Sequence, residues 1–234
     1  YIYNPCNLWL HRMEEKLKQQ LSDCVKVVLF GPESTGKTTL SKQLARHYNS
    51  VWVPEYAREY LQNKWNNERK TCEPKDLPPI ALGQMKLENE LAQKTDSVLI
   101  CDTDLLETKV YSEAYYVGSC DPVLDKYAQE NTYNLYLLTY IDTPWEADDL
   151  RDKPDERERM FKAFEKALAS NNRPYVLLKG NKKERLKKAV SNIDKLLNNA
   201  EMAEDLSPSD LEEATQEQLA RFDEALEEQQ ALEQ

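Results

Sequence analysis

Residues 31–38 read Gly-Pro-Glu-Ser-Thr-Gly-Lys-Thr and match the pattern GxxxxGK[ST] at every fixed position. In a loop of this kind, successive backbone N–H groups point inward at phosphate oxygens, and the N-terminus of the following helix adds positive potential. The Lys37 ammonium is expected to reach the β- and γ-phosphates of a nucleotide, and the Thr38 hydroxyl is expected to bind Mg²⁺. The loop therefore predicts a binding site for a nucleoside triphosphate.

A carboxylate that assists the magnesium ion is expected at the end of a neighbouring strand. Asp102 follows the apolar run 98–101 and occupies such a position, and Asp104 lies two residues further on. Acidic residues after a strand can also serve only as helix caps, which is the alternative for Asp104 above all. The sequence thus predicts two carboxylates at one strand tip, with Asp102 as the candidate metal ligand.

The segment Pro54–Tyr60 carries acidic and basic residues directly after a short apolar strand. A carboxylate at this place would face the phosphate acceptor, so Glu55 is a candidate to orient or deprotonate a substrate hydroxyl, with Arg58 as an anchor. Glu55 could instead be a first-turn acid that complements a helix dipole. The aromatic residues that could stack on a flat ring, or simply belong to the core, are Trp52, Tyr56, Tyr111, Tyr115 and Tyr116.

A charged segment, residues 142–159, contains Arg151, Arg157 and Arg159. Kinases with this phosphate-binding loop carry a mobile lid at the corresponding place, and its guanidinium groups stabilise the transferring phosphoryl group. The alternative, a solvated helix start with alternating charges, is expected for at least one of the three arginines. A GTPase is disfavoured, because residues 102–105 lack the glycine of a DxxG switch.

These residues need a scaffold, and apolar runs alternate with helical spacing along the chain. Five strands are predicted, at residues 25–30, 51–53, 97–101, 133–140 and 174–178. Helices are predicted at residues 37–48, 55–65, 80–94, 105–117, 122–130 and 183–197. This order predicts an α/β fold of the P-loop NTPase type, with a five-stranded, mostly parallel sheet and helices on both faces.

The charge of the chain is unevenly distributed. The 234 residues include 31 Lys and Arg against 42 Asp and Glu, which gives a net charge of −11. Twelve of the acids and a single base lie beyond residue 200, so the preceding body is charge-balanced. Such a body without a basic stripe is not expected to bind nucleic acid. There is no apolar run long enough for a membrane span, and five scattered cysteines without a CxxC pair favour a cytoplasmic location.

Together these motifs resemble the kinase domain of NadR-type proteins, the bacterial nicotinamide riboside kinases. The resemblance covers about residues 24–199 and rests on residues 31–38, 54–60, 81–84, 102–104 and 145–151. It implies transfer of the ATP γ-phosphate to the 5′-hydroxyl of nicotinamide riboside, which yields nicotinamide mononucleotide in NAD biosynthesis. It also implies ATP and Mg²⁺ as cofactors. The 23 residues before the domain are too few for the adenylyltransferase of larger family members, so a kinase activity alone is expected unless the sequence is a piece of a longer protein.

The resemblance assigns roles to individual residues. ATP binding is expected from Gly31, Glu33, Ser34, Thr35, Gly36, Lys37, Thr38 and Thr39. Catalytic roles are expected for Lys37, Glu55, Asp104 and Arg151, and substrate binding for Glu55, Tyr56, Arg58 and Asp104. The expected metal ligands are Thr38 and Asp102, and the expected lid residues are Arg151, Arg157 and Arg159.

Two rival functions stay open from the residues alone. One is a P-loop kinase that acts on another nucleoside or nucleotide. The other is an ATP-dependent regulatory or binding ATPase whose acidic tail recruits a partner.

Three regions are predicted: an N-terminal extension or helix (1–23), the kinase domain (24–199) and an acidic tail (200–234) that is helical or partly disordered. Ser207-Pro208-Ser209-Asp210 has the composition of a helix start, and a thin apolar stripe follows it. A solvated acidic helix is the simplest interpretation, and docking on the body or self-association through the tail is the alternative. Deleting residues 201–234 should leave kinase activity nearly unchanged, which an activity assay of the truncated chain would check.

Overall fold

The computed structural model describes residues 13–151 and 154–204. The chain forms two compact units, of which the first extends to Ile193 and the second begins at Asp194. The boundary between the units falls within the last described helix, α8 (Lys182–Glu204). The acidic tail from residue 205 onward, with the helix start expected at residues 207–210, lies outside the described residues, so the predicted domain bounds and tail behaviour stay predictions.

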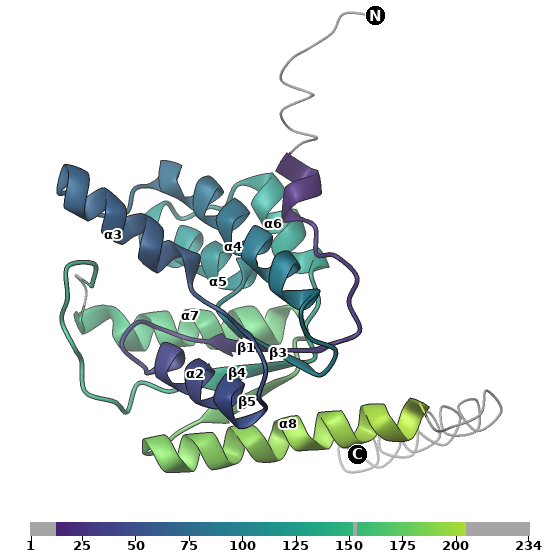
Figure 1. Ribbon diagram of the computed structural model, residues 1–234. Coiled ribbons are helices and arrows are strands. Elements are labelled where there is room, and N and C mark those ends of the chain that lie inside the picture. The colour runs from purple at the N-terminus through teal and green to yellow at the C-terminus, as the bar shows by residue number, and fades with distance from the viewer. Residues whose placement is uncertain (1–12, 152–153, 205–234) are drawn as a thin grey trace, which may run out of the picture. The chain divides into compact units, whose positions relative to one another are not determined.

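The first unit is built on a five-stranded sheet whose described strand pairs are all parallel. The strands are β1 (Val25–Phe30), β2 (Trp52–Val53), β3 (Val98–Asp102), β4 (Leu135–Thr139) and β5 (Tyr175–Leu178), in the spatial order β2-β3-β1-β4-β5. Because the strands are parallel, their carboxyl ends meet at one edge, at the left of Figure 1. The loops that carry the predicted site residues all leave the sheet there.

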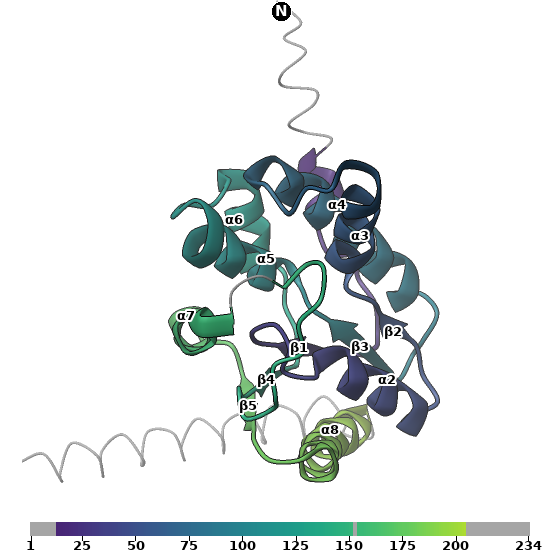
Figure 2. The same cartoon turned by 90° about the vertical axis from the view of Figure 1, so that its left-hand side faces the viewer.

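Helices cover both faces of the sheet (Figures 1 and 2). One face carries α2 (Lys37–His47) and the part of α8 that precedes Asp194, and the other carries α4 (Leu77–Ala92), α5 (Leu105–Tyr111) and α7 (Arg157–Ser170). Two further helices, α3 (Tyr56–Glu68) and α6 (Pro122–Glu130), pack on α4 and α5, respectively. The α/β fold with helices on both faces of a parallel sheet is therefore confirmed.

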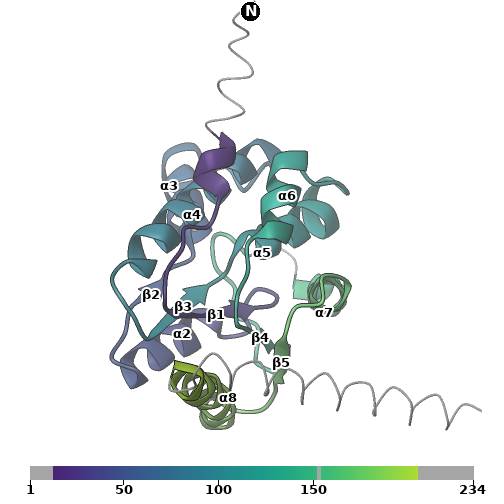
Figure 3. The ribbon, with the colours of Figure 1, turned by 90° about the vertical axis from the view of Figure 1, so that its right-hand side faces the viewer.

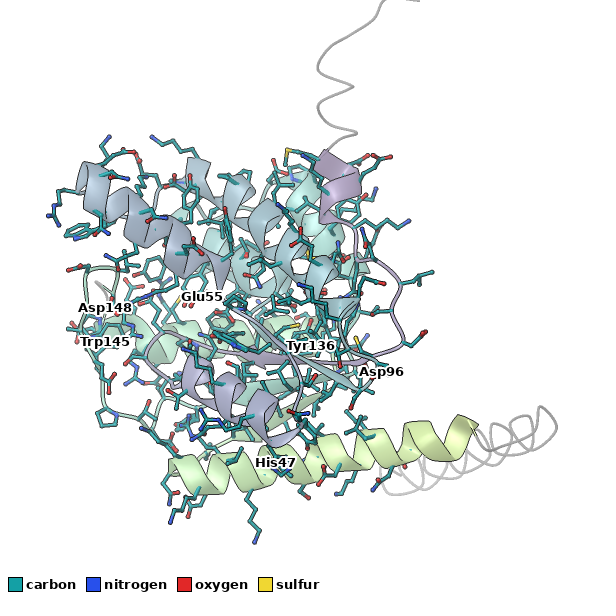
Figure 4. All side chains as sticks on the ribbon, in the orientation of Figure 1. His47, Glu55, Asp96, Tyr136, Trp145 and Asp148 are labelled. Carbon is teal, nitrogen blue, oxygen red and sulfur yellow. The ribbon has the colours of Figure 1, made fainter. Side chains whose placement is uncertain are left out.

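The sheet forms the core because its central strands are apolar on both faces. All six residues of β1 are buried, as are all five of β3 and of β4. The ring of Phe30 packs edge-on against Tyr136 at 5.4 Å and against Phe164 at 4.9 Å between ring centroids, which joins β1, β4 and α7. Figure 4 shows Tyr136 in the interior of this unit.

Helix α4 begins three residues earlier than the predicted start at Ile80. A short 3₁₀ turn over Pro74–Asp76 leads into it, and Glu73 and Asp76 cap each other's backbone N–H groups. Pro78 and Pro79 then lie in the first turn, where the missing N–H groups of proline would have no intrahelical partner anyway. The predicted helix start at residue 80 was therefore wrong by three residues.

Several other elements differ from the prediction in their limits; helix α3, for example, extends to Glu68 instead of residue 65. The single helix expected over residues 105–117 is α5 followed by a π-helical turn at Ser112–Tyr116. The last helix continues to Glu204 instead of ending near residue 197. Helix limits are the least certain part of a sequence-based prediction because the apolar spacing fades gradually.

Residues 13–21, which the sequence assigns to an N-terminal extension, pack on the first unit. Figure 3 shows this segment passing between α4 and α6 before it enters β1. Met13 and Leu17 are buried, and the Gln19 side chain donates a hydrogen bond to the carboxylate of Glu88 on α4 at 2.8 Å. The Asn131 amide, just after α6, donates to the carbonyl of Leu17. These residues thus contribute to the core of the unit.

Among the described residues, no helix is both long enough and apolar enough to cross a membrane. The four cysteines in that part of the chain, Cys24, Cys72, Cys101 and Cys120, are free thiols.

Candidate nucleotide and acceptor site

A cavity of about 940 Å³ opens at the carboxyl edge of the sheet. It is lined by the phosphate-binding loop and the start of α2, by the start of α3, and by the loop after β4. The residues singled out in the sequence that line it are Glu33, Ser34, Thr35, Gly36, Lys37, Thr38, Thr39, Trp52, Glu55, Tyr56, Arg58, Asp102, Tyr111, Tyr115, Tyr116 and Arg151. The structure therefore gathers at one cavity residues that are more than 100 positions apart in the chain.

The phosphate-binding loop is held in shape by strand β4. Gly31 has φ +133°, and a Cβ at this position would lie 2.8 Å from the Thr139 hydroxyl, so only glycine fits. The Thr35 hydroxyl donates to the Pro32 carbonyl at 2.8 Å and lies 2.7 Å from the Thr139 hydroxyl. The loop is therefore preformed around the place where phosphates would bind.

Lys37 lies in the loop, and its ammonium has three close oxygen partners. Its Nζ donates to the carbonyls of Gly31 at 2.5 Å and Pro32 at 3.2 Å, and it lies 3.1 Å from Oε1 of Glu107 on α5. Burial by itself would lower the pKa of Lys37, but the negative charges of Glu107, Glu55 and Asp102 outweigh it and raise the pKa. The ammonium is therefore charged at neutral pH and is placed beside the loop that binds phosphates.

Asp102 is the last residue of β3, with a side chain that is 0% exposed. Neither of its carboxylate oxygens completes a hydrogen bond within the described part of the chain. Burial, with help from the charge of Glu55, raises its pKa to about 6, against the opposing effects of the Thr38 hydroxyl and Lys37. A buried carboxylate with so few hydrogen bonds is costly unless a cation joins it. The pair Thr38 and Asp102 therefore fits a hard cation such as Mg²⁺.

Asp104 has a different setting from that of Asp102. It is the N-cap of α5, where one oxygen accepts the backbone N–H of Glu107 at 2.9 Å and the other accepts the Tyr136 hydroxyl at 2.7 Å. Burial raises its pKa to about 7, although the Tyr136 hydrogen bond opposes this. The residues that line the large cavity within the described chain do not include Asp104. The structure thus shows the helix cap that was the alternative for Asp104, and its acceptor-side role stays a prediction.

Glu55 and Tyr56 enter the cavity from the end of β2. Glu55 is the N-cap residue of α3, but its side chain makes no capping hydrogen bond in the described structure, which leaves its carboxylate to face the cavity. The backbone N–H of Tyr56 donates to the Gln84 side chain at 2.8 Å, and Gln84 in turn donates to the Pro54 carbonyl. Helix α4 therefore fixes the turn that presents Glu55.

The loop after β4 is tied to α3 through Asp148. One carboxylate oxygen of Asp148 accepts a hydrogen bond from Arg58 at 2.7 Å and lies 3.3 Å from Nε of Arg151. Burial alone would raise the pKa of Asp148, but these guanidinium groups lower it. Asp148 and Trp145 lie on the same side of the molecule as Glu55 (Figure 4). Arg58 is thus engaged by the loop after β4, and Arg151 is held at the cavity.

The other two predicted lid arginines differ from Arg151. Arg157 donates to the carbonyls of Thr143 at 3.0 Å and Ser34 at 3.3 Å, so it braces the phosphate-binding loop. Its guanidinium also lies 5.7 Å from the ring centroid of Trp145. Arg159 is exposed and pairs with Glu156 three residues earlier. Arg159 therefore fits the alternative given for these arginines, a solvated helix start with alternating charges.

Two buried residues at the site were not identified from the sequence. Glu107 pairs with Lys37, and Arg185 of α8 donates to the Thr35 carbonyl at 2.6 Å and pairs with Asp142. Glu107 follows Asp104 by three positions, which looks like an ordinary capping pair at the start of a helix. Neither residue has a local pattern that distinguishes it from a structural one.

Comparison with known proteins places the chain in a family. The sequence profile of the family described as AAA domain matches residues 26–185, which is more than half of the chain. The chain belongs to the AAA domain family. It is 30% identical over 157 residues to the trifunctional NAD biosynthesis/regulator protein NadR of Salmonella typhimurium strain LT2, and 28% identical over 152 residues to that of Escherichia coli strain K12. The resemblance to NadR-type proteins is confirmed.

These alignments cover 65% and 64% of this chain but only 38% and 37% of the relatives. The chain thus spans less than two-fifths of the length of these curated proteins.

Solved structures agree on the fold. The structure described as NadR protein in complex with NR superposes with a TM-score of 0.63 at 21% identity, over 83% of this chain and 56% of the other. Deoxyadenosine kinase from M. mycoides with bound dATP gives a TM-score of 0.52 at 15% identity, over 73% of this chain and 99% of the other. The P-loop fold predicted from the sequence is therefore shared with these proteins.

Proposed function

We propose that the chain is an ATP-dependent nicotinamide riboside kinase, which transfers the γ-phosphate to the 5′-hydroxyl of nicotinamide riboside. The observation that carries the proposal is the cavity that joins the Lys37 loop, the buried carboxylate of Asp102 and the acceptor-side residue Glu55. The acceptor itself is suggested by the relatives, which are named as NAD biosynthesis proteins, and by the solved NadR structure that is named as a complex with NR.

In this proposal, catalysis depends on positioning and on neutralising charge during in-line phosphoryl transfer. The loop backbone and Lys37 hold the β- and γ-phosphates. Arg151 lies at the cavity wall, where its guanidinium can approach the transferred phosphoryl group. Thr38 and Asp102 would hold Mg²⁺, which neutralises phosphate charge when it is bound.

On the acceptor side, Glu55 aligns the hydroxyl, and the ring of Tyr56 borders the space for the nucleoside. The four other aromatic residues of the cavity wall, Trp52, Tyr111, Tyr115 and Tyr116, supply further flat surface for a ring.

The proposal is tested by measuring ADP release with and without acceptors. Purified protein with ATP and Mg²⁺ should release ADP rapidly only when nicotinamide riboside is added. Thymidine, deoxyadenosine and thymidine monophosphate are the comparison acceptors in parallel reactions. Phosphorylation of one of these, with none of nicotinamide riboside, would assign a different acceptor. ADP release that no acceptor changes would favour the binding-ATPase alternative.

A further inference from the structure

Glu107 combines three properties that set it apart from the other acids of the first unit. Its side chain is only 3% exposed, and Oε1 lies 3.1 Å from Nζ of Lys37. The second oxygen, Oε2, is buried and has no hydrogen-bond partner in the described part of the chain. Burial of an unpartnered carboxylate oxygen is costly, so a group that reaches Oε2 would relieve that cost.

A small cavity of about 70 Å³ meets Glu107 beside the large one. Both cavities are bordered by Glu33, Glu55, Leu61, Cys72, Tyr111 and Tyr116, so they adjoin on the acceptor side. The lining of the small cavity includes three carboxylates, those of Glu33, Glu55 and Glu107, but no lysine or arginine of the described chain. A hydroxyl group can donate a hydrogen bond to such a wall, whereas a phosphate would be repelled by it.

The position of Glu107 relative to Lys37 decides its role. In kinases with this loop, the lysine contacts the phosphate that is transferred. The acceptor hydroxyl must approach the same phosphorus, so a carboxylate in contact with Lys37 lies close to the point of transfer. Asp104 cannot serve without giving up its bonds to Tyr136 and the helix backbone, because both of its oxygens are occupied.

We infer that Glu107 is a catalytic residue whose Oε2 accepts the hydrogen of the acceptor hydroxyl, while Glu55 lines the acceptor side next to it. The hydroxyl oxygen bonds to the γ-phosphorus, and its proton passes to Oε2. The bond between that phosphorus and the bridging oxygen to the β-phosphate breaks, and its electron pair leaves with ADP. The inference rests on the proposed kinase function.

The electrostatic setting of Glu107 is consistent with this role. Burial raises its pKa to about 8, although the neighbouring charge of Lys37 opposes the increase. A proton acceptor works best when its pKa is near the working pH. At neutral pH part of the Glu107 side chains carry no proton, and this form can take up the proton of the hydroxyl and release it afterwards.

The test compares Glu107→Gln with wild type in two measurements on the full chain. The first is kcat for nicotinamide mononucleotide formation, which should fall by about 100-fold or more, the usual contribution of a general base. The second is the dissociation constant of a non-hydrolysable ATP analogue with Mg²⁺, which should stay the same or become tighter because a negative charge beside Lys37 is removed. Glu113→Gln is the matched control, because Glu113 also pairs with a lysine, Lys109, but is exposed. Its kcat should equal that of wild type.

Glu107→Asp provides an independent variant, which keeps the charge but withdraws the carboxylate from the cavity. It should also lose kcat while it still binds the analogue. Near-normal kcat in Glu107→Gln would overturn the inference, and so would a loss of analogue binding as large as the loss of kcat, which indicates a structural role. A wild-type protein that forms no nicotinamide mononucleotide would instead overturn the proposed function.

Discussion

Lys37 has three close contacts, at least one of which phosphates would replace. Its three close acceptors are the carbonyls of Gly31 and Pro32 and the carboxylate of Glu107. An ammonium has three hydrogens, so binding to β- and γ-phosphates requires that at least one of these contacts is given up. The loop thus keeps the buried Lys37 ammonium hydrogen-bonded, and phosphate oxygens can replace one of its acceptors.

At the level of residues, the sequence carries a clearer signal for the nucleotide side than for the acceptor side. The loop 31–38 and Asp102 follow from a fixed pattern and from their place after buried strands. Glu107 could not be predicted, since its partner Lys37 is 70 positions away and only the fold brings them together. Asp104 and Glu107 share one helix start, and the sequence did not distinguish the capping residue from the one that meets Lys37.

Gly83 yields a prediction about the acceptor. A Cβ at this position would lie 2.1 Å from the ring of Tyr56, which lines the cavity. Gly83→Ala should push the ring into the acceptor space and raise the KM for nicotinamide riboside by on the order of tenfold. The KM for ATP should change little. Alanine has a higher helix propensity than glycine, by about 1 kcal/mol, and this gain should offset much of the stability lost to the contact with the ring. Steady-state kinetics with each substrate varied would measure this.

Lys86→Ala serves as the control for Gly83→Ala, because Lys86 lies on the same helix and is exposed. An unchanged KM for nicotinamide riboside in Gly83→Ala would contradict the role given to Tyr56.

At the level of elements, the loop after β4 and α3 meet through two neighbouring carboxylates. Asp148 joins Arg58 of α3 to Arg151 of the lid, and Gln62 of α3 donates to Asp149 at 3.4 Å. Surface ion pairs contribute only about 0.2–1 kcal/mol to stability, so the value of this contact lies in placing the lid.

Asp148→Asn should therefore lower kcat/KM for nicotinamide riboside about tenfold while the unfolding midpoint stays close to that of wild type. The exposed pair Glu158 and Lys162 provides the control, since Glu158→Gln removes an ion pair that lies outside the cavity wall. If kcat/KM of Asp148→Asn remained within twofold of wild type, the lid would not depend on this contact.

The elements themselves were largely predictable, because buried parallel strands are short apolar runs and the helices between them have regular apolar spacing. The errors occurred where a local signal was ambiguous. Pro78 and Pro79 indicate a loop or the first turn of a helix equally well, and only the capping contacts of Glu73 and Asp76 decide between the two.

At the level of the whole molecule, several carboxyl groups are buried with raised pKa values. Burial is the main cause in each case, and the values are about 6 for Asp102, about 7 for Asp104 and about 8 for Glu107, with Glu88 raised as well. The folded chain therefore holds protons that the unfolded chain has already released at neutral pH. A carboxyl group of this kind contributes its full stability below its unfolded pKa and loses it as pH rises through the folded value.

The nucleotide-free protein should consequently be more stable at pH 5.5 than at pH 8. The free energy of unfolding should fall by about 1.4 kcal/mol per pH unit for each proton that the folded state holds in excess. Urea unfolding at a series of pH values would measure the slope. Glu88→Gln should flatten it, since glutamine can keep the contacts with Gln19 and Tyr133 without a charge. Stability that rises from pH 5.5 to pH 8 would contradict the assignment of buried carboxyl groups.

The uneven distribution of charged residues is also a property of the whole molecule. The body is balanced, and the excess of twelve acids over one base lies beyond residue 200. The cavity can thus attract a triphosphate through Lys37, Lys42, Lys182 and Arg151 even though the whole chain is acidic.

The central claim, ATP-dependent phosphorylation of nicotinamide riboside at the Lys37 loop, is tested most directly by mass spectrometry. Wild-type protein and Lys37→Ala are incubated with ATP, Mg²⁺ and nicotinamide riboside, and nicotinamide mononucleotide is quantified, with circular dichroism to establish that both proteins are folded. The expected result is abundant product with wild type and essentially none with folded Lys37→Ala. Equal product from both proteins, or no product from wild type, would contradict the account.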